Sequence, residues 1–214
     1  HLTYQGGFPP DAADYGDYSA EGWGFRDSSG AYVAYSAFGA VAATATEELL
    51  EDVNGGWHDA GDYDRRTYHF NAVQDLLIAY FMFPDNFTDG QLNLPESGNG
   101  IPDIIDEARW GVEVWRQAQK ETGAVGTWIE ATSHPTDEEN WDPGTDPQPY
   151  YLSLGTRNSS LDYARYAAML GRALNMVGAA DEAVLYIESA REAYAFGTDD
   201  SVRVSTSWVV DGDT

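Results

Sequence analysis

The feature that most limits the fold is a pair of apolar stripes with helical spacing in the last third of the chain. Ser159 to Asp162 matches the S-x-x-D pattern of a helix start, Gly178 separates the two stripes, and Gly197 follows the second. The stripes consist of Tyr163, Ala167, Leu170, Leu174 and Val177, and of Ala183, Ile187, Ala190 and Tyr194. The sequence therefore predicts a helical hairpin over residues 159–197, because two helices joined by a short turn pack antiparallel.

Two more segments, residues 67–83 and 101–119, show the same helical spacing. The first carries apolar residues before a proline at position 84, namely Ala72, Leu76, Tyr80 and Phe83. In the second, Pro102 stands where the first turn of a helix tolerates proline. Its apolar stripe consists of Ile101, Ile105, Ala108, Val112 and Trp115. These segments predict two further helices.

Three acids lie in the opening turns of the helix predicted over residues 101–119: Asp103, Asp106 and Glu107. Carboxylates this close together invite a metal-binding or catalytic interpretation. The start of a helix carries partial positive charge, which favours anions without any ligand. We therefore expect a structural role for these acids.

The remaining segments carry weaker patterns. Residues 1 to about 30 are rich in Gly, Pro, Asp and Tyr, which predicts an irregular segment packed on a neighbouring surface. The Ala-rich run from Tyr32 to Asp52 predicts a helix over much of its length, with a strand over Ala31 to Phe38 as the alternative. Between Glu121 and Arg157 lies a long aromatic loop, and long ordered loops in compact domains usually serve a function.

The composition is strongly acidic. Asp and Glu total 36 against 11 Lys and Arg, which gives a formal net charge of -25 at pH 7. Such a chain repels phosphate backbones and anionic lipid, so we expect neither nucleic acid nor a membrane as a partner. An uncharged polysaccharide remains compatible with this charge. Because the sequence shows no cysteine, linker or repeat, we expect a single domain over residues 1–214 without disulfides or thiolate metal sites.

A glycine-punctuated turn, Gly-Gly-Trp-His-Asp-Ala-Gly-Asp-Tyr at residues 55–63, is the strongest candidate for chemistry. It places Asp59 and Asp62 three residues apart, just before the helical pattern resumes near Thr67. Close carboxylates orient water or accept protons, and the rings of Trp57 and Tyr63 offer flat faces to a sugar. The alternative is an acidic surface turn in an acidic protein.

The whole string closely resembles the signature near the start of family 9 glycoside hydrolases, the cellulase family with a toroid of six helical hairpins. A second string, Asn-Gly-Ile-Pro-Asp-Ile-Ile-Asp-Glu-Ala-Arg-Trp at residues 99–110, looks like a helix start of the same family. The resemblance runs from about residue 50 to about residue 197 and implies an all-α fold, the (α/α) toroid. It covers only the first half of such a catalytic module. We therefore expect the N-terminal half of the toroid, with the remaining half of its own module as a partner.

The resemblance also implies a reaction, the hydrolysis of β-1,4-glucosidic bonds with inversion in cellulose or related β-glucans and oligosaccharides. Inversion needs a base that activates water and an acid on the opposite face of the sugar, with the carboxyl groups about 6.5–9.5 Å apart. By the resemblance, Asp62 is the general base and Asp59 helps to hold the water. The family's general acid is a Glu of the C-terminal half, and none of the 14 Glu here lies in a matching motif. The chemistry requires no cofactor, the resemblance allows a structural calcium ion, and the metal ligands are unknown.

Aromatic residues complete the expected substrate site. The family places aromatic rings in a loop that corresponds to residues 121–157, so Trp141 is the leading candidate for stacking on a sugar, followed by Trp128 and Tyr151. The turn contributes Trp57 and Tyr63. For each ring of the long loop, the alternative is packing that holds the loop in place.

One departure from the family pattern affects specificity. The signature continues as Tyr63-Asp64-Arg65-Arg66 rather than the His-Val-Lys-Phe or Tyr-Gly-Lys-Tyr common in cellulases. An exo-acting or oligosaccharide-trimming enzyme is therefore as consistent with the sequence as an endo-acting cellulase. A second hypothesis is a non-catalytic glycan-binding or assembly protein on a retained toroid scaffold, because a fold alone does not fix function.

We expect a secreted or cell-surface protein. A chain that starts at His1, without an initiator Met, looks like a processed product or a fragment. Two N-x-S/T sequons, at Asn86 and Asn158, fit an exported protein that carries glycans.

Overall fold

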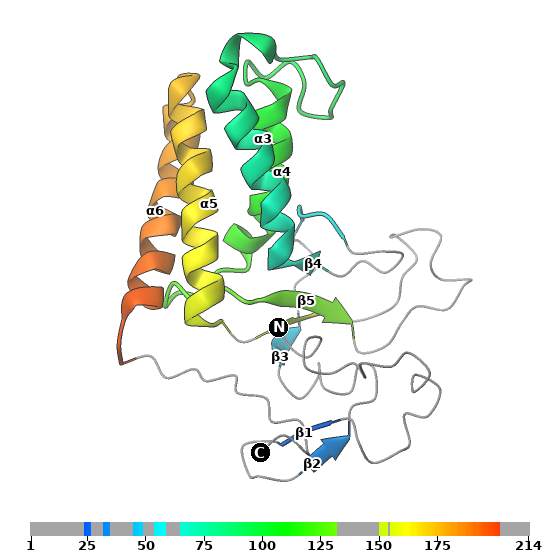
Figure 1. Ribbon diagram of the computed structural model, residues 1–214, viewed down its shortest axis with the longest axis vertical. Helices are drawn as coiled ribbons and strands as arrows, with labels where there is room; N and C mark the ends of the chain where they lie inside the picture. Colours follow the sequence, from blue (N-terminus) through cyan, green and yellow to red (C-terminus); the bar gives the residue numbers. More distant parts are fainter. Residues whose placement is uncertain are drawn as a thin grey trace, which may run out of the picture.

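The computed structural model of the 214-residue chain describes residues 24–26, 32–34, 45–48, 54–58, 65–131, 150–153 and 155–201. Within this part, helices α3 (Phe70–Met82) and α4 (Asp103–Gln117) pack side by side (Figure 1). Helices α5 (Arg157–Met176) and α6 (Ala180–Thr198) form a second pair, and α5 also contacts α3 and α4. The predicted helical hairpin and the two further predicted helices are confirmed.

An antiparallel sheet lies at one end of these helices, with its strands in the order β3, β6, β5, β4 (Figure 1). The strands are Ala45–Glu48 (β3), Arg65–Arg66 (β4), Trp128–Ala131 (β5) and Tyr150–Ser153 (β6). Strands β1 (Gly24–Arg26) and β2 (Tyr32–Ala34) pair with each other in a separate antiparallel sheet. Two short 3-10 helices flank α3, η2 (Thr67–His69) before it and η3 (Pro84–Asn86) after it.

Strands replace part of the helix predicted over Tyr32 to Asp52. Strand β2 agrees with the strand alternative over Ala31 to Phe38, whereas strand β3 shows that the helix prediction was wrong at Ala45–Glu48. Strand β3 pairs with β6, where Glu47 lies opposite Leu152. This ladder outweighs the intrinsic helix preference of so short a segment, because propensity is weak beside tertiary context. Strands β5 and β6 likewise occupy parts of the predicted loop at residues 121–157.

The apolar stripe predicted for α4 is confirmed, because all five of its residues are buried. The stripe predicted for α3 is wrong at two positions, since Ala72 and Phe83 are exposed. Because α3 packs against both α4 and α5, its buried face points between them, about one residue from the predicted stripe. The buried residues of α3 are Phe70, Val73, Leu77 and Tyr80.

Helix α5 begins earlier than predicted. Its N-cap is Thr156, whose hydroxyl accepts a hydrogen bond from the Ser159 N–H, while the Ser159 hydroxyl accepts one from the Thr156 N–H. Ser159, predicted as the start of the helix, is therefore the third helical residue of a capping box. Its hydroxyl also donates to the Val125 carbonyl at 2.6 Å, which ties the start of α5 to the segment before β5.

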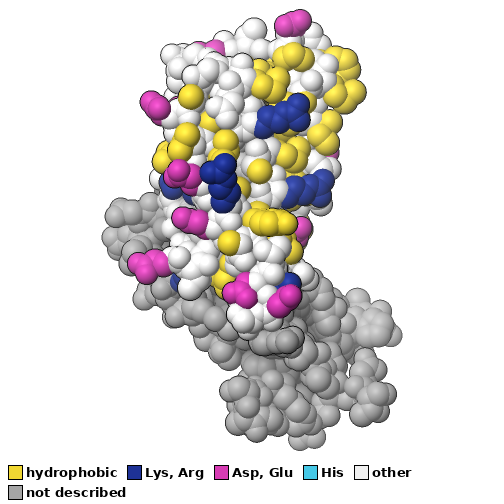
Figure 2. Space-filling view, turned by 90° about the vertical axis from the view of Figure 1, so that its left-hand side faces the viewer, with side chains coloured by type: hydrophobic (Ala, Val, Ile, Leu, Met, Phe, Trp, Pro, Cys, Tyr) yellow, Lys and Arg dark blue, Asp and Glu magenta, His cyan; other side chains and the backbone are white. Residues whose placement is uncertain are grey.

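The stripe predicted for α6 is only partly correct. Ala183 and Ala190 are buried and Ile187 packs at the edge of the core, but Tyr194 is 60% exposed. Ile187, Ala190 and Tyr194 line an open groove of about 520 Å³ between α5 and α6, opposite Leu161. Figure 2 faces this side of the molecule and shows hydrophobic side chains interspersed with basic ones.

None of the described helices combines the length and apolar character needed to cross a membrane.

Candidate active-site turn

The N-terminal end of the glycine-rich turn lies directly on α4. The Gly56 N–H donates to the Trp110 carbonyl at 2.6 Å. Gly55 and Gly56 have φ values of 96° and 73°, which side chains with a Cβ rarely adopt. A Cβ on Gly55 would also lie only 3.1 Å from the Trp110 carbonyl oxygen and from the Val114 nitrogen. Glycine thus lets this segment approach the backbone of the helix.

Trp57 fixes the next residue of the turn to the same helix. Its indole N–H donates to Oε1 of Glu107 at 2.7 Å. Its ring covers Gly111, where a Cβ would collide with it, and packs against the edge of the hydrophobic core. Glycine inside a helix costs about 1 kcal/mol of stability relative to alanine. At Gly111 the packing of the Trp57 ring, which no larger residue would allow, offsets this cost. Trp57, predicted to contact substrate, anchors the turn in the described structure.

The C-terminal end of the turn is also fixed. The Arg65 Nε–H donates to the Gly55 carbonyl at 3.0 Å, which joins the two ends of the turn. Arg65 and Arg66 form β4 and pair with β5, and Arg66 is 6% exposed. The Thr67 N–H donates to the Thr127 carbonyl at 3.1 Å, and the Thr67 hydroxyl donates to the same oxygen. The two described ends of the turn are therefore held together, with Gly55 and Gly56 on α4 and Arg65 on β5.

The candidate site residues fall into two groups. Trp128 lies in β5 with 2% of its surface exposed, so its burial favours the packing alternative. Tyr151 lies in β6, where it pairs with Glu130 of β5. The other candidates belong to the turn or to the long loop and lie outside the described residues: Asp59, Asp62, Tyr63 and Trp141.

The acids at the start of α4 have different roles, so helix-start electrostatics explains them only in part. Asp103 accepts hydrogen bonds from the Gly90 N–H at 2.8 Å, the Leu92 N–H at 2.5 Å and the Ser97 hydroxyl at 3.1 Å. Burial alone would raise the pKa of Asp103, but these donors hold its pKa below the usual value. Asp103 therefore organises the loop that precedes α4.

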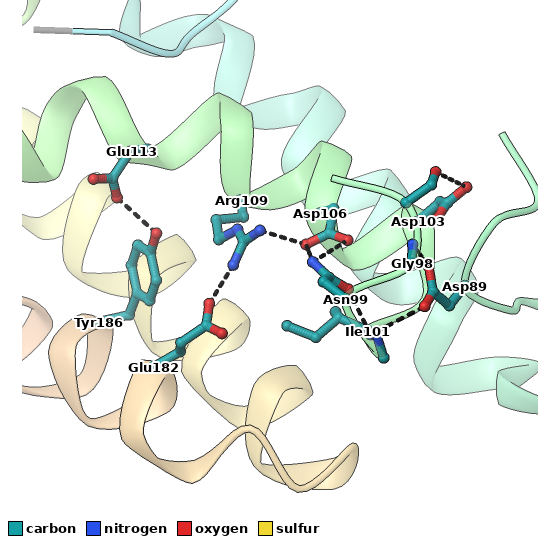
Figure 3. A network of polar contacts seen from close by, with 12 residues as sticks. Asp89, Gly98, Asn99, Ile101, Asp103, Asp106, Arg109, Glu113, Glu182 and Tyr186 are labelled. Carbon is teal, nitrogen blue, oxygen red and sulfur yellow. Dashed lines mark hydrogen bonds and ion pairs between the residues drawn. The ribbon is translucent and has the colours of Figure 1, made fainter. Parts of the chain in front are cut away.

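Asp106 joins the same loop to the facing helix (Figure 3). It accepts hydrogen bonds from the Asn99 amide and forms an ion pair with Arg109 at 2.6 Å. Arg109 also forms an ion pair with Glu182 of α6. Burial raises the pKa of Asp106 to about 6, although Arg109 and Asn99 oppose this rise.

These groups line a cleft of about 280 Å³ between α4 and α6, together with Glu113. Glu113 accepts a hydrogen bond from the Tyr186 hydroxyl at 2.6 Å (Figure 3). It also accepts two from Arg116, at 2.8 and 2.6 Å. Asp106, Arg109, Glu113, Arg116 and Glu182 are thus paired with one another, which suits a structural role. Within the described ranges, no group of three or more His, Asp or Glu side chains is arranged to hold a metal ion. The calcium ion that the resemblance allows stays a prediction.

Glu107 is the residue whose role the sequence did not indicate. Its partner, Trp57, is 50 residues away in the chain, so no spacing rule connects the two side chains. Gly111 was the available signal, because a glycine in an otherwise regular helix usually has a packing reason.

Comparisons with known proteins bear on this site. The sequence model of glycosyl hydrolase family 9 matches residues 11–212. The chain is 31% identical to a cellulose 1,4-beta-cellobiosidase of Acetivibrio thermocellus, over 57% of this chain and 15% of that protein. It is 34% identical to endoglucanase C of Cellulomonas fimi, over 58% of this chain and 12% of that protein. The chain thus spans less than a fifth of either relative.

Among solved structures, the chain resembles a metagenome-derived family 9 endoglucanase, with a TM-score of 0.63 and 33% identity over 82% of this chain and 32% of that one. It also resembles a Zn-binding triple mutant of the family 9 endoglucanase J30, with a TM-score of 0.57 and 25% identity over 80% of this chain and 34% of that one. These similarities confirm the predicted all-α class, in which the helical hairpins form part of an (α/α) toroid.

Proposed function

We propose that this chain, which belongs to glycosyl hydrolase family 9, forms part of an enzyme that hydrolyses β-1,4-glucosidic bonds in cellulose or a related β-glucan with inversion. The observation that carries the proposal is the turn between Gly55 and Arg65, which contains both candidate acids and is fixed at both ends. The cellobiosidase and endoglucanase among its relatives support a β-glucan as the substrate. Because the chain spans only part of these proteins, the activity is a property of the complete protein.

The proposed mechanism places the two acids on the water side of the sugar. Asp62 removes a proton from the attacking water, and Asp59 holds that water through its other hydrogen. The water oxygen bonds to the anomeric carbon as the bond to the leaving oxygen breaks on the opposite face, so the configuration inverts. The leaving oxygen needs a proton from a separate acid, since Asp59 and Asp62 are too close in sequence to span the glycosidic bond. We assign that acid to a Glu elsewhere in the complete module.

The unusual Tyr63-Asp64-Arg65-Arg66 sequence does not decide between endo and exo action. Arg65 bonds to the Gly55 carbonyl and Arg66 is buried, which supports a role in holding the turn rather than in contacting the sugar. One relative is named a cellobiosidase and another an endoglucanase, so the proposal includes both modes of action.

The remaining part of the module is the proposed partner of the exposed α5–α6 face. The groove there is lined by Leu161, Ile187 and Tyr194, together with Arg165 and Arg191. Helices of an α/α toroid bury such faces against the neighbouring hairpin.

A further part of the proposal is that the protein acts outside the cell or at its surface, where a polymeric glucan is accessible. Asn86 and Asn158 are both exposed, as sequon residues that carry glycans must be.

The test uses the complete protein and a soluble β-glucan. Replacement Asp62→Asn keeps the size of the side chain but removes the base, so kcat should fall by about 100-fold or more. The control is Asp181→Asn, at an exposed position in the first turn of α6, which removes the same charge away from the turn. Near wild-type turnover by Asp62→Asn would refute the assignment of the base.

The wild-type protein separates this proposal from the binding hypothesis. Hydrolysis should release first products of the α configuration, which proton NMR resolves before they mutarotate. Glucan binding without any turnover in the complete protein would instead support a non-catalytic glycan-binding or assembly protein on the same scaffold.

A further inference from the structure

We infer that Glu107 is a positioning residue for the catalytic turn and that it acts through Trp57. The inference rests on the proposed function, because it takes Asp59 and Asp62 as the catalytic acids. It connects the two sequence motifs, at residues 55–63 and 99–110. The first motif supplies the acids, and the second supplies the helix surface on which the first is mounted.

Three contacts define this mounting. The hydrogen bond from the Gly56 N–H to the Trp110 carbonyl fixes the backbone directly before Trp57. The contact of the Trp57 ring with Gly111 sets how closely the turn approaches α4. The hydrogen bond to Glu107 sets the orientation of the indole, because an indole has a single N–H donor. Removal of that bond leaves only the packing of the ring to hold the indole in this orientation.

The mounting is close enough to the acids to govern their position. Asp59 follows Trp57 by two residues, which span at most about 7 Å of extended chain. At the other end, Asp62 precedes Arg65 by three residues, and Arg65 is bonded to Gly55. Because both ends of so short a loop are fixed, a displacement of Trp57 is passed on to the carboxylates. Misplacement of reacting groups by about 1 Å can cost about 100-fold in rate.

Helix α4 is a suitable platform, because it is held independently of the turn. Its buried stripe includes Val112 and Trp115, which pack in the core. The neighbouring acids have other partners, since Asp103 bonds to the preceding loop and Asp106 bonds to Asn99 and Arg109. Glu107 is therefore the acid of this motif that contacts the turn.

The experiment compares four variants in the complete protein. Trp57→Phe removes the donor, Glu107→Ala removes the acceptor, and Glu107→Gln keeps an acceptor oxygen. Tyr186→Phe is the matched control, because it removes one 2.6 Å hydrogen bond to another carboxyl group of α4, Glu113, away from the turn. We expect Trp57→Phe and Glu107→Ala to lower kcat by about tenfold or more with KM within about twofold, and Glu107→Gln to recover most of the loss.

A second measurement reports position without catalysis. Hydrogen exchange in the peptide that covers residues 54–66 should accelerate in Trp57→Phe and Glu107→Ala and stay unchanged in Tyr186→Phe. The inference is overturned if Glu107→Ala keeps the kcat and exchange rates of the control. If Asp62→Asn is inactive in that case, the proposed function stands and only the positioning role fails. If Asp62→Asn is fully active, the proposed function itself fails.

Discussion

Replacement of Asp106 by asparagine should remove a pH-dependent penalty on stability. Asp106 is 2% exposed, and burial raises its pKa from 3.8 to about 6. Glu96 of the preceding loop and Glu182 of α6 add to this rise, while Arg109 on the same helix opposes it. Because the pKa is higher in the folded protein than in the unfolded chain, protonated Asp106 favours folding. This contribution is complete below about pH 4 and is lost as the pH rises through about 6.

The magnitude follows from the difference between the two pKa values. Each pKa unit corresponds to about 1.36 kcal/mol, so the shift from 3.8 to about 6 corresponds to about 3 kcal/mol. Asparagine has no titrating proton, and its amide oxygen can still accept from Asn99 or Arg109. The free energy of unfolding of the wild type, minus that of Asp106→Asn, should therefore fall by about 3 kcal/mol between about pH 4 and about pH 7.

The assay is urea unfolding of the complete protein and of Asp106→Asn at a series of pH values and constant ionic strength. Asp103→Asn is the contrasting variant, because the pKa of Asp103 is lowered by its backbone donors against the effect of burial. Its contribution has the opposite sign, since it is present above the ordinary pKa of an aspartate and is lost as the pH falls. A wild-type minus Asp106→Asn difference that stays flat within about 0.5 kcal/mol, or that rises with pH, would refute the reasoning.

Three further expectations concern the helix cap, the long loop and the exposed groove. Thr156→Ala should cost about 1 kcal/mol of stability by removing the N-cap of α5, and a thermal melt that matches the wild type would contradict this role. Trp141→Ala in the complete protein should weaken oligosaccharide binding by about 1–2 kcal/mol, whereas unchanged affinity in calorimetry would assign the ring to packing. The isolated chain of residues 1–214 should aggregate or bind a hydrophobic dye through the α5–α6 groove, and co-expression with the rest of the module should rescue it. A compact isolated chain with a cooperative melt would oppose this view.

The helices were the most predictable part of the fold, because their cores repeat along one face. All five residues of the α4 stripe are buried, although α4 also buries Ile104 and Val114 outside that stripe. In α3 the stripe was shifted, because Phe70 and Val73 pack between two neighbouring helices and the sequence does not show where those helices lie. Strand β3 was missed for a related reason, since its conformation depends on the distant partner strand β6.

In the candidate site, too, local features were predictable from the sequence and long-range contacts were not. Asp59 and Asp62 are predicted as catalytic acids from a local string of residues, which the sequence displays directly. The support of that string by Glu107 was not predictable, because the contact between Trp57 and Glu107 joins residues far apart in the chain. For Trp128 the local signal was misleading. Its aromatic ring suggested a platform for a sugar, but its position in β5 buries the ring.

The role of Asp62 as the general base can be tested directly by replacing its attacking water with another nucleophile. In the complete protein, Asp62→Ala leaves a space beside the anomeric carbon, and azide is a small nucleophile that needs no base to activate it. With an activated aryl β-cellobioside, azide should attack from the face opposite the leaving group, and NMR should identify a glycosyl azide of the α configuration. We expect this product together with a loss of hydrolysis of about 100-fold or more. A β-configured azide, or hydrolysis at the wild-type rate, would contradict this role.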